Sequence, residues 1–147
     1  MKTITNNLAA LLLTIAFGAQ ADSYWVVNDE YNAAQISFAD GLTVAVVFSE
    51  ERSCKEPQLV LKGNSNISNL IVVIDGDTFT NSNGQPSLTH TKGVAYDIGD
   101  NLLDALKYNG SNAALVTNQG VWTMSLEGAG DAIIEAWAVC FIRGLKQ

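Results

Sequence analysis

Short segments in which apolar and polar residues alternate fill most of this 147-residue chain after its first twenty positions. A period of two is typical of β-strands with one buried face, so these segments predict strands. The clearest pair surrounds Asp40-Gly41, a dipeptide that between two such runs predicts a tight hairpin. The apolar residues of this pair are Ile36 and Phe38 before the turn, and Leu42, Val44, Val46 and Phe48 after it.

The same pattern predicts further strands along the chain, with a second hairpin around Asn118-Gln119-Gly120. In the last strand, Trp122, Met124 and Leu126 share one face. The predicted strands are Tyr24–Val27, Gln58–Lys62, Leu70–Ile74, Gly93–Ile98, Ala113–Thr117 and Val121–Leu126. Segments 64–68 and 81–91, rich in Asn and Ser, are expected to form exposed loops.

Two segments have helical spacing. Asp100 is predicted to cap a short helix that ends at Asn109-Gly110. The segment from about Asp131 to Arg143 is apolar nearly all round, which predicts a largely buried helix. We therefore expect one α+β domain, mainly an antiparallel β-sandwich with one short helix and a buried C-terminal helix.

Residues 1–21 have the features of a secretory signal peptide: Lys2, an apolar run over 8–17 and the small-x-small site Ala19-Gln20-Ala21. The apolar run is shorter than the ~20 residues that span a bilayer, so we expect cleavage and no membrane span afterwards. The exported domain is then 22–147, located in the periplasm, in the medium or at the cell surface.

Cys54 and Cys140 are the two cysteines, and an oxidising compartment favours pairing them. A redox or nucleophilic thiol is the alternative, but neither cysteine lies in a C-x-x-C motif or close to a histidine in sequence. The sequence therefore predicts a structural disulfide that ties the C-terminal helix to the loop after the strand ending at Ser49.

Acidic residues outnumber basic ones. The full chain has 15 acidic and 8 basic residues, a net charge of −7, and loss of Lys2 on export makes it −8. Nucleic acid and anionic lipid are therefore disfavoured as partners, whereas a basic protein is favoured. No cofactor is expected.

Two groups of residues are candidates for a binding site, and each also has a simpler structural interpretation. Tyr24, Trp25 and Tyr31 either fill the edge of the core, which we favour, or form a partner-binding patch. Glu50, Glu51 and Glu56 are expected on a solvated loop, where Glu50 and Glu51 are candidates for contact with a partner, although a carboxylate pair for glycoside hydrolysis is an alternative.

Two further features invite a catalytic or metal-binding interpretation. Asp75 and Asp77 are weak candidates for a calcium site, but the remainder of an EF-hand loop is missing, so a turn is preferred. His90, the only histidine, lies in a polar loop and is expected to be exposed and non-catalytic.

The C-terminal third has the order helix, hairpin, helix and late cysteine, with Asn101-Leu102-Leu103-Asp104-Ala105-Leu106 followed by Val121-Trp122-Thr123-Met124-Ser125-Leu126-Glu127-Gly128. Over roughly 50 residues it resembles small exported bacterial proteins related to invasion-associated locus B. The resemblance implies a β-rich periplasmic or surface protein with no known catalytic residues.

We expect a non-enzymatic binding module of the bacterial envelope, of the inhibitor or immunity type, whose partner is a basic protein. One alternative is a structural component of a secretion, conjugation or filamentous-phage assembly, which would show a contiguous apolar patch and self-association. The other is a small hydrolase that uses His90.

Overall fold

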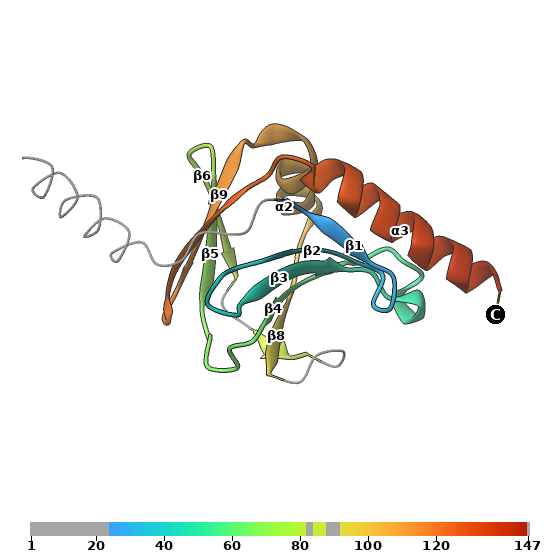
Figure 1. The fold of residues 1–147 in the computed structure, drawn as a ribbon, viewed down its shortest axis with the longest axis horizontal. Coiled ribbons are helices and arrows are strands. Elements are labelled where there is room, and N and C mark those ends of the chain that lie inside the picture. The colour runs from blue at the N-terminus through green and yellow to red at the C-terminus, as the bar shows by residue number, and fades with distance from the viewer. Residues whose placement is uncertain (1–23, 82–83, 88–91, 147) are drawn as a thin grey trace, which may run out of the picture.

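The computed structural model describes residues 24–81, 84–87 and 92–146 (Figure 1). The predicted signal peptide and His90 lie outside the described residues. The described part confirms the predicted α+β class, with two antiparallel sheets and a C-terminal helix.

The first sheet has six strands in the order β1-β2-β3-β4-β8-β7, and every neighbouring pair is antiparallel. Its strands are β1 (Val26–Asn28), β2 (Ala33–Ser37), β3 (Thr43–Val47), β4 (Gln58–Lys62), β8 (Gly93–Asp97) and β7 (Gln85–Pro86). The Asp40-Gly41 turn joins β2 to β3 as predicted, with Gly41 in the left-handed region at a φ of 98°.

The second sheet has four strands in the order β10-β9-β5-β6, again antiparallel throughout. Its strands are β5 (Leu70–Ile74), β6 (Asp77–Asn81), β9 (Asn112–Thr117) and β10 (Gly120–Ser125). The sequence pattern missed β6 and β7. Both are edge strands with mostly exposed side chains, so burial imposes no alternation on them.

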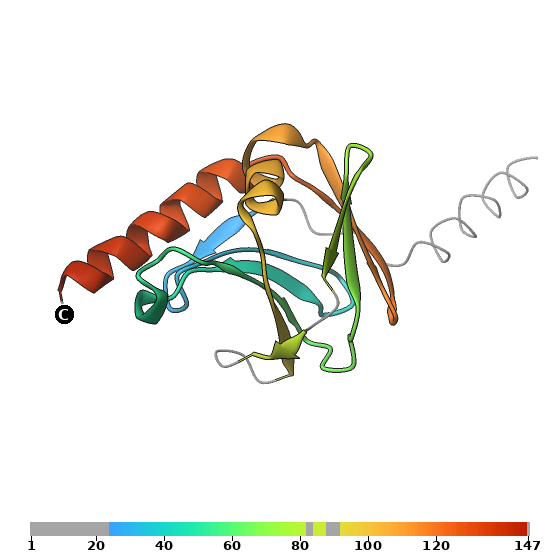
Figure 2. The same ribbon diagram turned by 180° about the vertical axis from the view of Figure 1, so that it is seen from behind.

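The core lies between the two sheets, whose strands cross steeply (Figures 1 and 2). The predicted faces are confirmed: Val44 and Val46 of β3 and Trp122 and Met124 of β10 are all buried in it. Trp122 also links the sheets, because its Nε1 donates to Oδ2 of Asp40 at 2.9 Å.

Helical segments follow β3, β8 and β10 along the chain. They are the 3₁₀ turn η1 (Glu50–Arg52), α2 (Asp100–Asp104), the π-helical turn η2 (Ala105–Asn109) and α3 (Ala129–Leu145). The prediction that Asp100 caps α2 is wrong, since Gly99 occupies that position without a side-chain cap. Asp100 instead lies in the first turn, where its negative charge is favourable next to the free backbone N–H groups.

The C-terminal helix α3 is longer than predicted and is buried along one face only. Its buried residues are Ala129, Ala132, Ile133, Ala136 and Cys140. The expectation of a largely buried helix holds only for this inner face, because α3 packs against the β1 and β2 edge of the larger sheet, beside η1 and η2, and no described element covers its outer side. Figures 1 and 2 show its C-terminal end projecting beyond the sheets.

Candidate functional site

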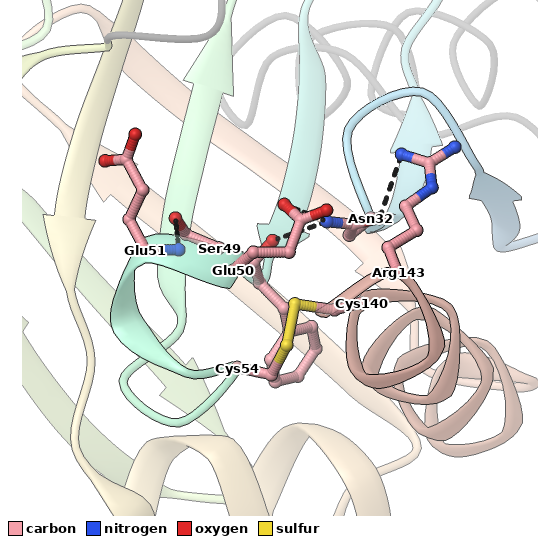
Figure 3. The surroundings of a disulfide bond; sticks show 8 residues. Asn32, Ser49, Glu50, Glu51, Cys54, Cys140 and Arg143 are labelled. Carbon is pink, nitrogen blue, oxygen red and sulfur yellow. Dashed lines mark hydrogen bonds between the residues drawn. A yellow bond between two sulfur atoms is a disulfide. The ribbon is translucent and has the colours of Figure 1, made fainter. Parts of the chain in front are cut away.

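The predicted disulfide between Cys54 and Cys140 is present and holds α3 against the body of the protein (Figure 3). The two Cα atoms are 5.9 Å apart, and 86 positions separate the cysteines along the chain. Cys54 follows η1 in a left-handed turn with Ser53, which brings its side chain toward the helix. Cys140 is completely buried, so the bond fixes the inner face of α3.

A polar network accompanies the disulfide (Figure 3). Asn32 is buried, and its Nδ2 donates to the Phe48 carbonyl and to Oε2 of Glu50, each at 3.2 Å. Nη1 of Arg143 donates to Oδ1 of Asn32 at 3.2 Å and to the Glu30 carbonyl at 3.3 Å. The Arg143 side chain is therefore directed toward the turn between β1 and β2, and its hydrogen bonds attach the C-terminal half of α3 to that turn.

The outer side of α3 carries a row of large apolar residues, which we name the α3 stripe. Their exposed fractions lie between 43% and 71%, values far above those of core residues. Four members recur at intervals of three or four positions and so share one face, with the fifth, Ile142, beside them. The α3 stripe consists of Ile134, Trp137, Phe141, Ile142 and Leu145.

Two aromatic rings form the centre of the α3 stripe. The rings of Trp137 and Phe141 are stacked, with centroids 5.4 Å apart and planes 18° from parallel. Stacking holds both side chains in place and leaves their outer surfaces uncovered by any described element. An aromatic pair held in this way loses little conformational freedom when a second molecule covers it.

A groove of about 740 Å³ lies beside the α3 stripe, and we name it the α3 groove. Ile134 and Trp137 belong to both features, so the two surfaces are continuous. The volume is in the range of sites that bind small ligands or protruding side chains. The other apolar lining residues are Phe48, Cys54, Pro57, Ile98, Leu103 and Ile133, and the charged ones are Lys55, Glu56, Asp100 and Lys107.

Carboxylates border these surfaces. Asp131 is three positions before Ile134 and four positions before Glu135, so these two exposed carboxylates lie on the same side of α3, along one border of the α3 stripe. Asp100 lines the α3 groove on its other side. Of the lysines at the α3 groove, Lys107 has its Nζ 4.9 Å from the centre of the Tyr108 ring, and Lys55 is next to Glu56 in sequence.

The structure separates the three aromatic residues Tyr24, Trp25 and Tyr31. Trp25 is buried, and its Nε1 donates to the Ser125 carbonyl at 2.9 Å. This confirms the expectation that Trp25 fills the edge of the core. The alternative, that Trp25 belongs to an exposed partner-binding patch, is wrong. Tyr24 is exposed, whereas Tyr31 packs on the opposite face of the larger sheet. The three side chains therefore do not form one patch.

The glutamates of η1 lie beside the disulfide (Figure 3). Glu50 is partly buried and accepts from Asn32, while Glu51 is exposed and its backbone N–H donates to Oγ of Ser49. Neither lines the α3 groove, which takes Glu56 from this region instead.

Asp75 and Asp77 lie at the hairpin between β5 and β6. Asp75 and Gly76 form its turn with φ values of 49° and 88°, which confirms the turn interpretation. Both aspartates line a second cavity of about 480 Å³ together with Asp104. Within the described ranges, no group of three or more His, Cys, Asp or Glu side chains is placed to hold a metal ion.

The sequence pattern predicted the disulfide but not the α3 stripe or the α3 groove. The lining of the α3 groove comes from segments around residues 48–57, 98–107 and 133–137, which only the fold brings together. The one available signal is the apolar outer side of the C-terminal helix, and that pattern by itself predicts burial.

Among the helices of the described residues, none is long and apolar enough to cross a membrane. The chain matches no protein-family model, no curated protein and no solved structure.

Proposed function

We propose that this protein is an exported, non-enzymatic binding module of the bacterial envelope, and that the α3 stripe and the α3 groove are its binding surface. The observation that carries the proposal is the exposed apolar side of a helix whose other side is fixed by a disulfide. An aromatic and aliphatic surface next to a concave site is typical of protein docking sites. A helix held in place offers that surface with little loss of entropy on binding.

The charge of the chain supports a basic protein as the partner, in the manner of an inhibitor or immunity protein. With the signal peptide removed, the net charge is −8. Complementary charge accelerates association and selects among partners, whereas the apolar contact supplies most of the affinity.

Export is supported by three features: the N-terminal signal pattern, the disulfide and the resemblance to invasion-associated locus B-related proteins. The disulfide and the β-rich fold are compatible with a periplasmic, secreted or cell-surface location.

A second candidate function is a structural component of an envelope assembly, in which copies of the chain pack through the α3 stripe. The contiguity of the α3 stripe favours it, since large exposed apolar patches mark interfaces. Light scattering over a range of protein concentrations distinguishes the two functions. A particle mass that rises with concentration supports self-assembly, and a constant monomer mass supports the binding module.

The binding function is tested with immobilised protein comprising residues 22–147 and periplasmic extract at low and high salt. Captured proteins are identified by mass spectrometry, purified and titrated by calorimetry. We expect a basic protein that binds with 1:1 stoichiometry and loses affinity as salt increases. Capture that salt does not change, or no basic protein among those captured, contradicts the proposal.

A further inference from the structure

From the chemistry of the α3 stripe and its borders, we infer that the docking segment of the partner is an amphipathic helix with a row of aliphatic residues flanked by Lys or Arg. The inference rests on the proposed function and specifies which part of the partner binds and how. The occupant is a segment of a different protein.

The shape of the surface indicates a helical occupant. From Ile134 to Leu145, the α3 stripe covers twelve residues, and the eleven steps between its ends correspond to roughly 16 Å along the helix axis. A second helix of about three turns matches this length and presents apolar residues at the same intervals of three and four. One of its larger side chains enters the α3 groove at the continuous junction formed by Ile134 and Trp137.

The borders indicate the charge of the occupant. A helix lying on the α3 stripe has Asp131 and Glu135 along one side. On the other side, the α3 groove has two carboxylates, Glu56 and Asp100, and two lysines, Lys55 and Lys107, so the excess of negative charge lies along α3. Arg143 is held in the network with Asn32, and the exposed Lys146 lies at the C-terminal end of the α3 stripe, away from Asp131 and Glu135 in its first half. Lys or Arg on the flanks of the incoming helix would pair with the carboxylates, so a basic amphipathic helix is favoured over an acidic one.

Electrostatics also distinguish this occupant from a second copy of the chain. Two copies, each with a net charge of −8 after export, repel one another before contact, whereas a basic segment is attracted. Self-association through α3 is therefore an outcome that would overturn the inference.

The test uses two synthetic 14-residue peptides with capped ends. One has Leu at i, i+3, i+4, i+7 and i+11 with Lys at the flanking positions, and the other has Glu in place of every Lys. Binding to the oxidised protein of residues 22–147 is measured by calorimetry and by tryptophan fluorescence. Since Trp25 and Trp122 are buried and Trp137 is exposed, docking on α3 shifts the emission to shorter wavelength.

Matched variants locate the contact. D131N/E135Q removes two carboxylates beside the α3 stripe, and D75N/D77N removes two beside the other cavity, which shares no lining residue with the α3 groove. Asparagine readily adopts the left-handed conformation of the Asp75 turn, so the control keeps the backbone. We expect the first variant to weaken binding of the Lys peptide about fivefold and the second to change it less than twofold.

Apolar contact is tested by Phe141→Ser against Tyr24→Ser, since both residues are exposed aromatics and Tyr24 belongs neither to the α3 stripe nor to the lining of the α3 groove. Phe141→Ser is expected to weaken binding at least tenfold, whereas Tyr24→Ser leaves it unchanged. Circular dichroism and light scattering of each variant verify that it remains folded and monomeric.

Several outcomes overturn the inference: binding of the Glu peptide as tightly as the Lys peptide, equal effects of the two double variants, a dimer that covers α3, or no saturable binding up to about 1 mM. Failure of the proposed function is a separate result. If Phe141→Ser weakens the binding of a captured basic protein and D131N/E135Q does not, the proposed binding surface stands and the basic docking helix is wrong. If neither variant weakens it, the protein binds a basic partner through a surface other than the α3 stripe. If no basic protein is captured, the function itself is contradicted.

Discussion

Loss of the Cys54–Cys140 disulfide is expected to destabilise the protein strongly. The bond closes a loop with a sequence separation of 86, and the chain-entropy relation gives about 4.5 kcal/mol at 25 °C for a loop of that length. Domains of this size are usually stable by only about 5–15 kcal/mol, so this is a large fraction of the total. The double variant C54A/C140A is the perturbation, since alanine leaves no buried polar group.

The assay is equilibrium unfolding in urea, followed by tryptophan fluorescence and far-ultraviolet circular dichroism. We expect the free energy of unfolding of C54A/C140A to fall by about 3–5 kcal/mol. Reduced wild-type protein should match the variant, because both lack the cross-link. A difference below about 1 kcal/mol between oxidised protein and C54A/C140A would refute the argument that the cross-link limits the unfolded chain.

The same variant has a local prediction. The first half of α3 is still packed in the core by Ala129, Ile133 and Ala136, whereas the second half loses its covalent attachment. Hydrogen exchange should therefore accelerate more in residues 138–145 than in 129–137. Uniform acceleration along α3 would contradict this arrangement.

Three further predictions concern individual side chains. Tyr96→Phe should raise the free energy of unfolding by up to about 1 kcal/mol in urea titrations. The reason is that the buried Tyr96 hydroxyl has no hydrogen-bond partner among the described residues. A lower free energy of unfolding in the variant would contradict this explanation. The Arg52 guanidinium lies 2.8 Å from the Asp97 carboxylate and holds the pKa of that carboxyl below its usual range. The pair therefore stabilises the fold at pH values above the pKa that Asp97 has in the unfolded chain. This contribution is lost as the pH falls through the pKa of Asp97 in the folded protein. Arg52→Ala should return the pKa of Asp97 toward its ordinary value in an NMR titration, with little change in stability because the pair is exposed. Asp40→Ala should cost about 1–2 kcal/mol in thermal unfolding, since Asp40 accepts from the indole of Trp122 and from a backbone N–H in its own turn; an unchanged midpoint would show that these bonds contribute nothing net.

The strands that the sequence predicted best are those with strict constraints on burial. Gln58–Lys62 and Leu70–Ile74 match β4 and β5 at both ends, because each has apolar residues that meet the core. Asp77–Asn81 escaped prediction because hydrogen bonds to β5 define that strand while its side chains are mostly exposed.

Burial of α3 could not be predicted from its composition. An apolar helix is buried all round only if the rest of the chain supplies elements to cover every side, and that depends on where the helix packs. Here the edge of one sheet, η1 and η2 cover one side, and the residues from Ile134 to Leu145 that face outward are left exposed. The disulfide was predictable because two cysteines in a chain that is predicted to be exported have one intramolecular pairing.

Radical footprinting tests the central claim most directly, namely that a disulfide-fixed α3 presents its apolar side for docking. In the oxidised monomer, Trp137 and Phe141 should be oxidised faster than Trp25 and Trp122, and addition of the Lys peptide should protect the first pair alone. Oxidation of Trp137 as slow as that of Trp25 in the free monomer, or protection by the peptide at sites other than α3 and its groove, would contradict the claim.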